Sequence, residues 1–182
     1  MIKFSLPLLG FCAYSGTGKT TLLTTLLPLL KTHGLRVGMV KHAHHRFDID
    51  YPGKDSYELR KAGAQQMLVT SRQRMALIVE SSTQQDEPVL EDVLTMLSPA
   101  TLDLVLVEGF KHAAIPKIEL YRPSLGKPLM YPTDNNIIAI ASDTPLEISD
   151  HPIRQFDLNH AEEIAHFILH NFMQASAPQT MR

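Results

Sequence analysis

Short apolar runs recur along this chain and are separated by polar or amphipathic stretches. A nearly continuous apolar run bounded by turn residues is typical of a parallel strand that is buried on both faces. The segment 117–121 instead alternates between polar and apolar residues, which is the pattern of a strand with one buried face. We therefore predict strands at 6–14, 35–41, 102–107, 117–121 and 137–141.

Other segments place their apolar residues three and four positions apart, which is helical spacing. They predict helices at 18–32, 88–97 and 159–173. Pro28 falls inside the first of these, and we expect it to kink or end that helix nearby. A short fourth helix, from about residue 55 to residue 62, is predicted by its end signals: Asp55 or Ser56 as the cap and Gly63 as the terminator.

Two further apolar stretches, 65–69 and 75–80, flank a polar turn and predict a β-hairpin. Strands that alternate with helices imply an α/β fold with a mostly parallel sheet, and the hairpin adds an antiparallel component. We therefore expect a three-layer sandwich with a mixed, mostly parallel sheet. The length fits a single domain over residues 1–173, followed by a disordered tail at 174–182.

The charge balance limits the classes of partner. The chain has 17 basic and 19 acidic side chains and a net charge of −2, which argues against a nucleic-acid coat or a polybasic membrane binder. No apolar run approaches the roughly 18 residues of a membrane-spanning helix. Cys12 is the single cysteine, so no intrachain disulfide forms and a reducing cytoplasm fits. Because the chain as a whole is nearly neutral, any site for an anion must be built from a loop and a few local residues.

One such site is indicated at residues 13–20, AYSGTGKT, between the first strand and the first helix. The sequence matches the phosphate-binding loop G-x-x-x-x-G-K-[ST], except that Ala13 takes the place of the first glycine, where only a small residue is needed. The alternative is a flexible glycine turn that happens to contain a lysine. The strand before and the leucine-rich helix after favour the phosphate loop.

In that interpretation, the backbone N–H groups of Ser15, Gly16, Thr17 and Gly18 form a nest for phosphate oxygens, and the helix N-terminus adds a positive dipole. The last three positions carry side-chain chemistry. Lys19 reaches the β- and γ-phosphates, Thr20 binds Mg²⁺ through its hydroxyl, and Thr21 contacts an inner phosphate.

Two acids are candidate partners of the metal ion. Glu108 ends the apolar run 102–107, where a carboxylate at the strand's carboxyl end would hold Mg²⁺, often through water. Asp103 starts the same run and belongs at the opposite edge. Asp50 lies in the polar segment 42–54 and is placed to act as a switch-like ligand of Mg²⁺ or its water. A plain solvated loop is the alternative for that segment.

Three histidines in the same segment, His42, His44 and His45, raise the alternative of a transition-metal site. Basic residues near loops or strand ends are more often solvated than functional. This group comprises Arg60, Arg72, Arg74, Lys111 and Lys117.

Base selection is predicted at Asp143, which follows the strand 137–141. The usual guanine reader N/T-K-x-D is absent. A carboxylate here could accept two hydrogen bonds from guanine N1–H and N2–H₂, which adenine cannot supply. The alternative is that Asp143 merely starts the turn into Pro145.

Together these segments resemble the MobB family of molybdopterin-guanine dinucleotide biosynthesis adaptor proteins. The resemblance rests on AYSGTGKTTLL (13–23), VKHAHHRFDID (40–50), PGKDSYELRKAGA (52–64), LDLVLVEGFKHAAIPKIELYR (102–122) and IAIASD (138–143). It implies a P-loop NTPase-like fold, GTP binding with weak hydrolysis, homodimers formed through the sheets, and partnership with the guanylyltransferase MobA. It assigns nucleotide binding to Gly16, Gly18, Lys19 and Thr20, and Mg²⁺ to Glu108. It leaves open whether molybdopterin itself is bound.

The residues also bear on activity and assembly. No glutamine follows VEG at 107–109 and no arginine finger is recognisable, so at most a weak GTPase is expected. The apolar hairpin strands could pair with a second copy. A small-molecule kinase and a metallochaperone GTPase remain the alternative functions.

Overall fold

The computed structural model describes residues 2–43, 47–80, 87–148 and 152–176. Contacts divide the chain into two compact units, Met1–His42 with Val89–Arg182, and Ala43–Pro88. The single domain over 1–173 therefore stays a prediction. Most of the expected tail lies outside the described residues, although the closing helix runs to Ser176, three residues beyond its predicted end at 173.

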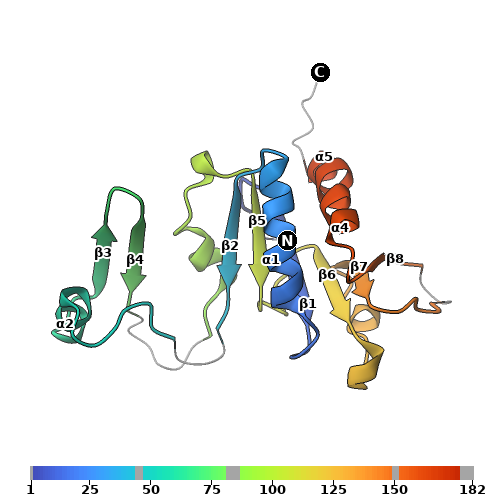
Figure 1. Ribbon diagram of the computed structural model, residues 1–182, viewed down its shortest axis with the longest axis horizontal. Helices are drawn as coiled ribbons and strands as arrows, with labels where there is room; N and C mark the ends of the chain where they lie inside the picture. Colours follow the sequence, from blue (N-terminus) through green and yellow to red (C-terminus); the bar gives the residue numbers. More distant parts are fainter. Residues whose placement is uncertain (1, 44–46, 81–86, 149–151, 177–182) are drawn as a thin grey trace. The chain divides into compact units, whose positions relative to one another are not determined.

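The first unit is built on a six-stranded sheet in the order β2-β5-β1-β6-β7-β8 (Figure 1). Every pairing in it is parallel. The strands are β1 Leu8–Ala13, β2 Val37–Lys41, β5 Leu104–Glu108, β6 Lys117–Tyr121, β7 Ile137–Ser142 and β8 Arg154–Asp157. The five predicted strands are confirmed. The edge strand β8 was missed because its sequence, RQFD, is short, largely polar and half exposed.

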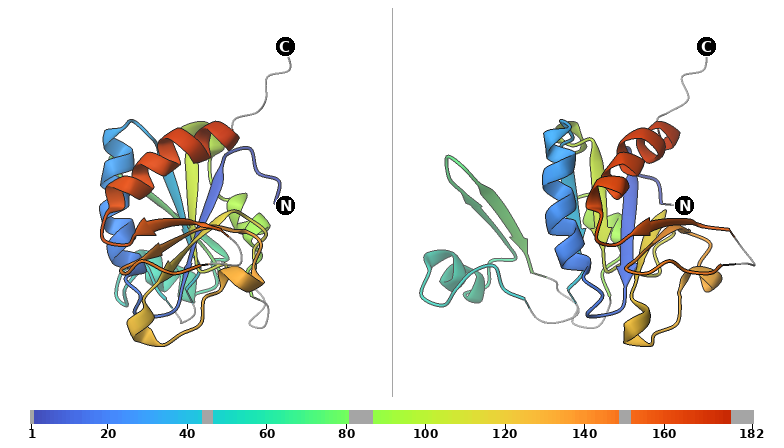
Figure 2. Two further views of the ribbon diagram at one scale, coloured as in Figure 1. Left: turned by 90° about the vertical axis from the view of Figure 1, so that its right-hand side faces the viewer. Right: turned by 45° about the vertical axis from the view of Figure 1, so that its right-hand side comes forward.

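Helices cover both faces of this sheet. On one face, α1 (Lys19–Thr32) lies beside the C-terminal helix (Figure 2). That helix runs as α4 (Ala161–Phe167), the π-helix η4 (Ile168–Phe172) and α5 (Met173–Ser176). On the other face, α3 (Leu90–Leu94) packs on Val105 and Val107. The three-layer sandwich is thus confirmed. Among the described helices, none has the length and apolar character that a bilayer crossing requires.

Alternate residues of the central strands feed the two cores. Leu9 and Phe11 of β1 join the core under α1 and α4, whereas Leu8 joins the core under α3. All six residues of β1 are buried, as are all five of β5. Short 3₁₀ helices at η1 (Pro99–Thr101), η2 (Pro123–Leu125) and η3 (Tyr131–Thr133) complete the connections.

Pro28 does not end α1, which continues to Thr32. A proline removes one N–H donor from the helix ladder. Pro28 is exposed, so water can satisfy the carbonyl that loses this donor, while Leu26 and Leu30 on either side are fully buried. Burial of that leucine face outweighs the lost hydrogen bond.

The second unit holds the hairpin β3 (Gln66–Thr70) and β4 (Met75–Val79), which pair antiparallel as predicted. They form a two-stranded sheet of their own. The expected mixed sheet is therefore two sheets, one parallel and one antiparallel. The short turn lets each hairpin strand satisfy its neighbour's backbone groups.

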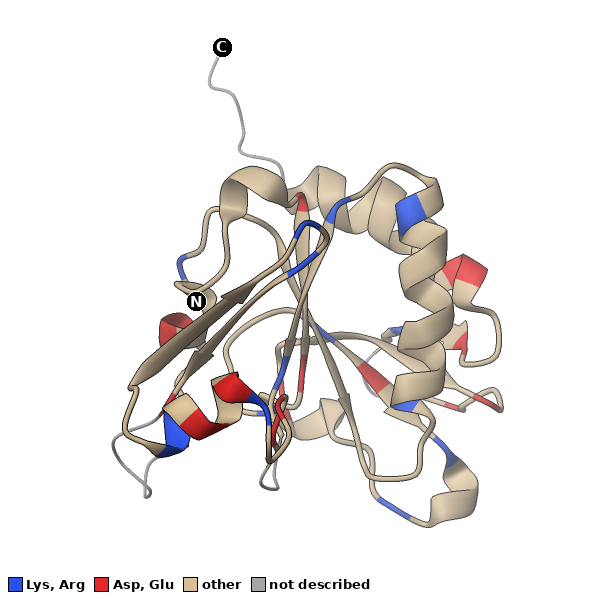
Figure 3. Ribbon diagram, turned by 60° about the vertical axis from the view of Figure 1, so that its left-hand side comes forward, with Lys and Arg blue, Asp and Glu red and all other residues tan. Residues whose placement is uncertain are grey.

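The helix α2 (Asp55–Lys61) precedes the hairpin and carries acids in its first turn and bases in its last (Figure 3). The capping prediction was wrong, because Lys54 occupies the cap position and Asp55 is already helical. Glu58 instead reaches back to accept the Gly53 N–H at 3.1 Å. The predicted terminator is confirmed: Gly63 has a φ of +117°, and its N–H donates to the Arg60 carbonyl.

Asp103 lies at the amino-terminal edge of β5, as predicted, and pairs with Arg36. The Arg36 Nη2 atom is 2.7 Å from Oδ1 of Asp103, and the Arg36 backbone N–H donates to Oδ2 at 2.8 Å. Hydrogen bonds from the Arg36 side chain and backbone lower the pKa of Asp103 to about 2. The ionised carboxylate is therefore favoured in the folded chain.

We predict that this pair stabilises the fold at neutral pH and fails in acid. Because the folded pKa of Asp103 is about 2 against an ordinary 3.8, the contribution is complete above 3.8 and is lost as the pH falls through 2. Asp103→Asn should lower the thermal midpoint at pH 7, and the deficit should shrink in acid. A carbon-detected NMR titration that gives Asp103 an ordinary pKa would contradict this.

Candidate functional site

The segment between β1 and α1 is a tight loop. Gly16 and Gly18 have φ angles of +83° and +99°, a region that side-chain-bearing residues rarely adopt. Thr17 closes the loop, since its hydroxyl donates to the Tyr14 carbonyl at 2.8 Å. The predicted strand, loop and helix are thus confirmed as a unit, and both glycines are needed for the path of the backbone.

The start of α1 presents backbone donors beside this loop. The first intrahelical bond runs from Leu22 N to Gly18 O at 2.9 Å, and no side chain caps the helix. The N–H groups of Lys19, Thr20 and Thr21 therefore have no partner within the helix, an arrangement that suits an anion. Thr20 and Thr21 are exposed, as is Ser15 in the loop. Thr17 is buried, and its groups are used internally: its hydroxyl and its N–H both donate to the Tyr14 carbonyl, at 2.8 and 3.4 Å, and its carbonyl accepts from Arg122.

Glu108 lies between two lysines at the same edge of the sheet. Its Oε1 is 3.4 Å from Lys19 Nζ, and its Oε2 is 3.6 Å from Lys41 Nζ. The side chain of Glu108 is only 11% exposed. Its predicted position beside the phosphate loop is confirmed. No separate role was predicted for Lys41, because its approach to Glu108 depends on the pairing of two strands that are distant in the chain.

The ends of β2 and β5 are held tightly together. Lys41 is in register with Glu108, and the His42 N–H donates to the Glu108 carbonyl at 2.9 Å. Gly109 follows with a φ of +95°, and a Cβ there would stand 2.9 Å from the His42 carbonyl oxygen. Only glycine permits this approach, which fixes Lys41 beside Glu108.

The donor set at this edge fits Mg²⁺. The Thr20 hydroxyl and the Glu108 carboxylate are hard oxygen ligands, which this ion prefers. Thr20 would bind the ion through its hydroxyl. Glu108 would hold the ion directly or through water, in place of its ion pairs with Lys19 and Lys41. Bound Mg²⁺ would neutralise phosphate charge. The metal roles of both residues remain predictions.

Asp143 and the phosphate loop are joined by Arg122, which sequence reasoning missed. Arg122 follows β6 and donates from Nε to the Thr17 carbonyl at 2.8 Å. Its Nη1 lies 2.6 Å from Oδ2 of Asp143. The only available signal was its position directly after a strand neighbouring β1.

Asp50 belongs to the second unit, so its approach to Mg²⁺ remains a prediction. Its backbone N–H donates to Asp48 Oδ1 at 3.2 Å, and its own Oδ1 accepts the Tyr51 N–H at 3.0 Å. Asp48 is anchored by Arg60, whose Nη2 is 2.7 Å away.

Arg60 also pairs with Glu80 at 2.6 Å and is buried, which corrects the expectation of a solvated side chain. His44 and His45 lie outside the described residues.

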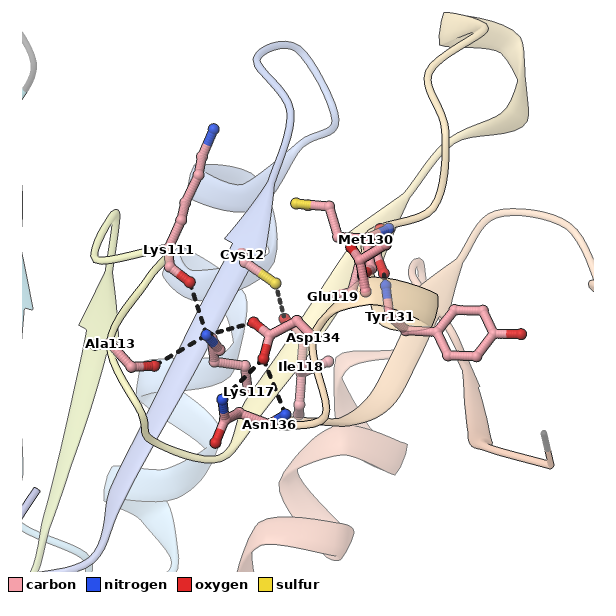
Figure 4. A network of polar contacts seen from close by, with 11 residues as sticks. Cys12, Lys111, Ala113, Lys117, Ile118, Glu119, Met130, Tyr131, Asp134 and Asn136 are labelled. Atoms are coloured by element: carbon pink, nitrogen blue, oxygen red, sulfur yellow. Dashed lines mark hydrogen bonds and ion pairs between the residues drawn. The ribbon is translucent and has the colours of Figure 1, made fainter. Parts of the chain in front are cut away.

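Lys117 is a second basic residue that the structure buries. Its Nζ pairs with Asp134 Oδ2 at 2.6 Å and donates to the carbonyls of Lys111 at 2.7 Å and Ala113 at 3.0 Å (Figure 4). These carbonyls belong to the loop that follows Glu108. A Cβ on Gly10 would lie 2.6 Å from Lys117 Cγ, so the glycine in β1 makes room for this side chain.

A buried carboxylate completes this network (Figure 4). Glu119 is fully buried and accepts the N–H groups of Met130 and Tyr131, both at 2.8 Å. Burial raises the pKa of Glu119, and these two N–H groups offset part of the effect. Burial, with the nearby Glu119 charge, also raises the pKa of Cys12 to about 12, so this thiol is not a reactive nucleophile.

Comparison with known proteins gives a consistent result. Residues 8–143 match the family described as "Molybdopterin guanine dinucleotide synthesis protein B". A molybdopterin-guanine dinucleotide biosynthesis adapter protein of Escherichia coli (strain K12) is 48% identical over 92% of this chain and 94% of its own length. One from Haemophilus influenzae is 43% identical over 92% of each chain.

Solved structures agree in fold. The crystal structure of a molybdopterin-guanine biosynthesis protein B has a TM-score of 0.68 at 27% identity and covers 89% of this chain and 96% of its own. A MobB homologue from Bacillus stearothermophilus has a TM-score of 0.66 at 26% identity, covering 92% of this chain and 98% of its own. The P-loop NTPase-like α/β fold expected from the resemblance is confirmed.

We predict that Lys117→Met destabilises the fold by about 2–3 kcal/mol, because Asp134 Oδ2 and the carbonyls of Lys111 and Ala113 lose their donor. The loss is smaller than for a fully buried pair, since the Asp134 side chain is 24% exposed. Urea unfolding measures it. Lys31→Met, at an exposed position near the end of α1, should stay within about 0.5 kcal/mol of the unsubstituted protein. An equally small effect at Lys117 would contradict the prediction.

Proposed function

This chain belongs to the MobB family of molybdopterin guanine dinucleotide synthesis proteins, and we propose that it is a GTP-binding adaptor in the biosynthesis of that cofactor. The observation that carries the proposal is the phosphate loop with Lys19 paired to Glu108 at the carboxyl edge of the sheet. The curated relatives are named adapter proteins, which supports a role beside an enzyme rather than as one.

The charges at the site support a triphosphate bound with Mg²⁺. Lys19, Lys41 and the free N–H groups at the start of α1 all lie at one edge, with Glu108 as the acid between the lysines. Mg²⁺ on Glu108 would release both lysines toward phosphate oxygens. Hydrolysis would be weak, because phosphoryl transfer needs a positioned water and transition-state charge stabilisation that the sequence does not evidently supply.

The guanine base is proposed to be read by Asp143. The contact through Arg122 places this carboxylate in the same network as the phosphate loop, which supports a position within reach of one nucleotide. A carboxylate attracts the N1–H of guanine and repels the N1 lone pair of adenine.

The partner enzyme implied by the family is the guanylyltransferase MobA, which attaches a guanine nucleotide. Both proteins would act in the cytoplasm, where the buried Cys12 thiol stays reduced.

A homodimer is proposed through the hairpin of the second unit. Leu68, Met75, Leu77 and Val79 share one face of β3 and β4, because Leu68 is opposite Leu77 in the register. These side chains are 45–68% exposed. A two-stranded hairpin is marginal in isolation, and an exposed apolar face of this kind marks an interaction surface. A second copy of the hairpin offers a matching face.

We predict that calorimetric titration with Mg²⁺ and GTP gives saturable binding that Lys19→Ala abolishes. Lys19 directly follows the loop and pairs with Glu108, so its loss removes a cation and also leaves Glu108 facing the phosphates. Lys31→Ala, which removes the same charge at the far end of α1, is the matched control and should bind as the unsubstituted protein does. Binding that survives Lys19→Ala would place the nucleotide elsewhere.

A titration with ATP and three further assays separate the alternative functions. Stronger binding of ATP, followed by phosphorylation of a small acceptor, would favour a kinase. Retention of Ni²⁺ or Zn²⁺ through dialysis, lost when His42, His44 and His45 are all replaced, would favour a metallochaperone. Unaided GTP turnover of many cycles per second would contradict the adaptor.

We predict that the unsubstituted protein sediments at twice its 20.4 kDa monomer mass, and that Leu77→Lys sediments as a monomer. A charge at the centre of the apolar face cannot be buried without a partner. Gln73→Lys adds the same charge in the exposed hairpin turn and should leave the dimer intact. Unchanged sedimentation of Leu77→Lys would exclude this face.

A further inference from the structure

The order of the strands places Arg122 between the phosphate loop and Asp143. β6 lies between β1 and β7 in the sheet. Ala13 is in register with Leu120, and Tyr121 is in register with Ser142. The residue that directly follows β6 therefore has the start of the loop on one side and Asp143 on the other.

The Arg122 side chain contacts both neighbours. Its Nε–H donates to the Thr17 carbonyl at 2.8 Å, while Nη1 pairs with Asp143 Oδ2 at 2.6 Å. The guanidinium also covers Gly18, since a Cβ there would lie 3.4 Å from Nη2. A planar group that donates in two directions is a property of arginine that lysine lacks.

The second oxygen of Asp143 is unsatisfied. Oδ1 is buried and has no hydrogen-bond partner among the residues that the structure describes. A buried carboxylate oxygen without a donor is costly. Asp143 lines a pocket of about 220 Å³ with Ser142 and Gln155, and Arg122 lines another of about 160 Å³ with Gly18. A ligand that brought an N–H group to Oδ1 would supply the missing donor.

We propose that Arg122 is a positioning residue for base selection. It holds Oδ2 of Asp143, so that Oδ1 alone accepts the N1–H of a 6-oxopurine, and it ties this acceptor to the phosphate loop through the Thr17 carbonyl. The inference rests on the proposed GTP binding and deepens it. It also replaces the two-hydrogen-bond interpretation of Asp143, because one of the two oxygens is already committed.

Inosine triphosphate distinguishes the two interpretations. Inosine keeps the N1–H but lacks the 2-amino group of guanine. With one reading oxygen, the inosine nucleotide should bind within about threefold of GTP, and ATP at least about tenfold more weakly. A loss of about tenfold or more for the inosine nucleotide would show that both oxygens read the base, and would overturn the proposal.

The role of Arg122 is tested by calorimetric titration of variants with the same three Mg²⁺-bound nucleotides. Arg122→Ala should weaken GTP binding about tenfold and reduce the GTP-to-ATP preference to within about threefold. Arg122→Lys should recover most of the affinity, because it restores the charge, but not the preference, because an ammonium cannot hold both partners. The matched control is Arg36→Ala, which removes an arginine–aspartate pair at the opposite edge and should change neither.

Contrary outcomes are separable. Arg122→Ala with unchanged affinity and preference overturns the proposal, as does full recovery of the preference by Arg122→Lys. Equal binding of GTP and ATP by the unsubstituted protein overturns base reading but leaves nucleotide binding standing. Absence of nucleotide binding overturns the proposed function as well. If circular dichroism shows that Arg122→Ala is unfolded, Arg122→Gln replaces it with the same expectations.

Discussion

The parallel pairing of β1 with β5 on one side and β6 on the other is the constraint on which the candidate site depends. Parallel strands end at the same edge, so the segments that follow them meet there although they are distant in sequence. The phosphate loop follows β1, Glu108 ends β5 and Arg122 follows β6. β1 is buried throughout, so this arrangement is held by the core itself.

In each of the two units, buried or half-buried cations determine where loops lie. Lys117 holds the loop after Glu108 through two carbonyls, and Arg122 holds the phosphate loop through one. Arg60 does the same for the loop that contains Asp48. Each donates to a carbonyl or carboxylate from a separate segment, so a single charged side chain orders backbone that has little apolar surface of its own. Such contacts are expected where rigid positioning matters more than net stabilisation.

These same cations mark the limit of what the sequence could predict. The phosphate loop, the position of Glu108 and the five apolar strands were predictable, because each depends on local pattern and on the chemistry of a few adjacent residues. Arg60 and Lys117 were expected to be solvated, and Arg122 was not singled out, because their roles depend on partners far away in the chain. The strand β8 was missed for a related reason: its polar sequence is made a strand by pairing with β7.

The charge at the site indicates how a nearly neutral chain would bind the nucleotide that we propose. The chain carries a net charge of −2, so attraction for a nucleotide must come from local groups. The charges of Lys19, Lys41 and Glu108 sum to +1, and the pair of Arg122 and Asp143 is neutral. In the proposed complex, the backbone N–H groups of the loop and of α1 would therefore supply much of the remaining attraction. These dipoles act only at hydrogen-bonding distance. The conformation of the loop, and hence the two glycines and Arg122 that fix it, would therefore govern the proposed binding more than the net charge of the surface does.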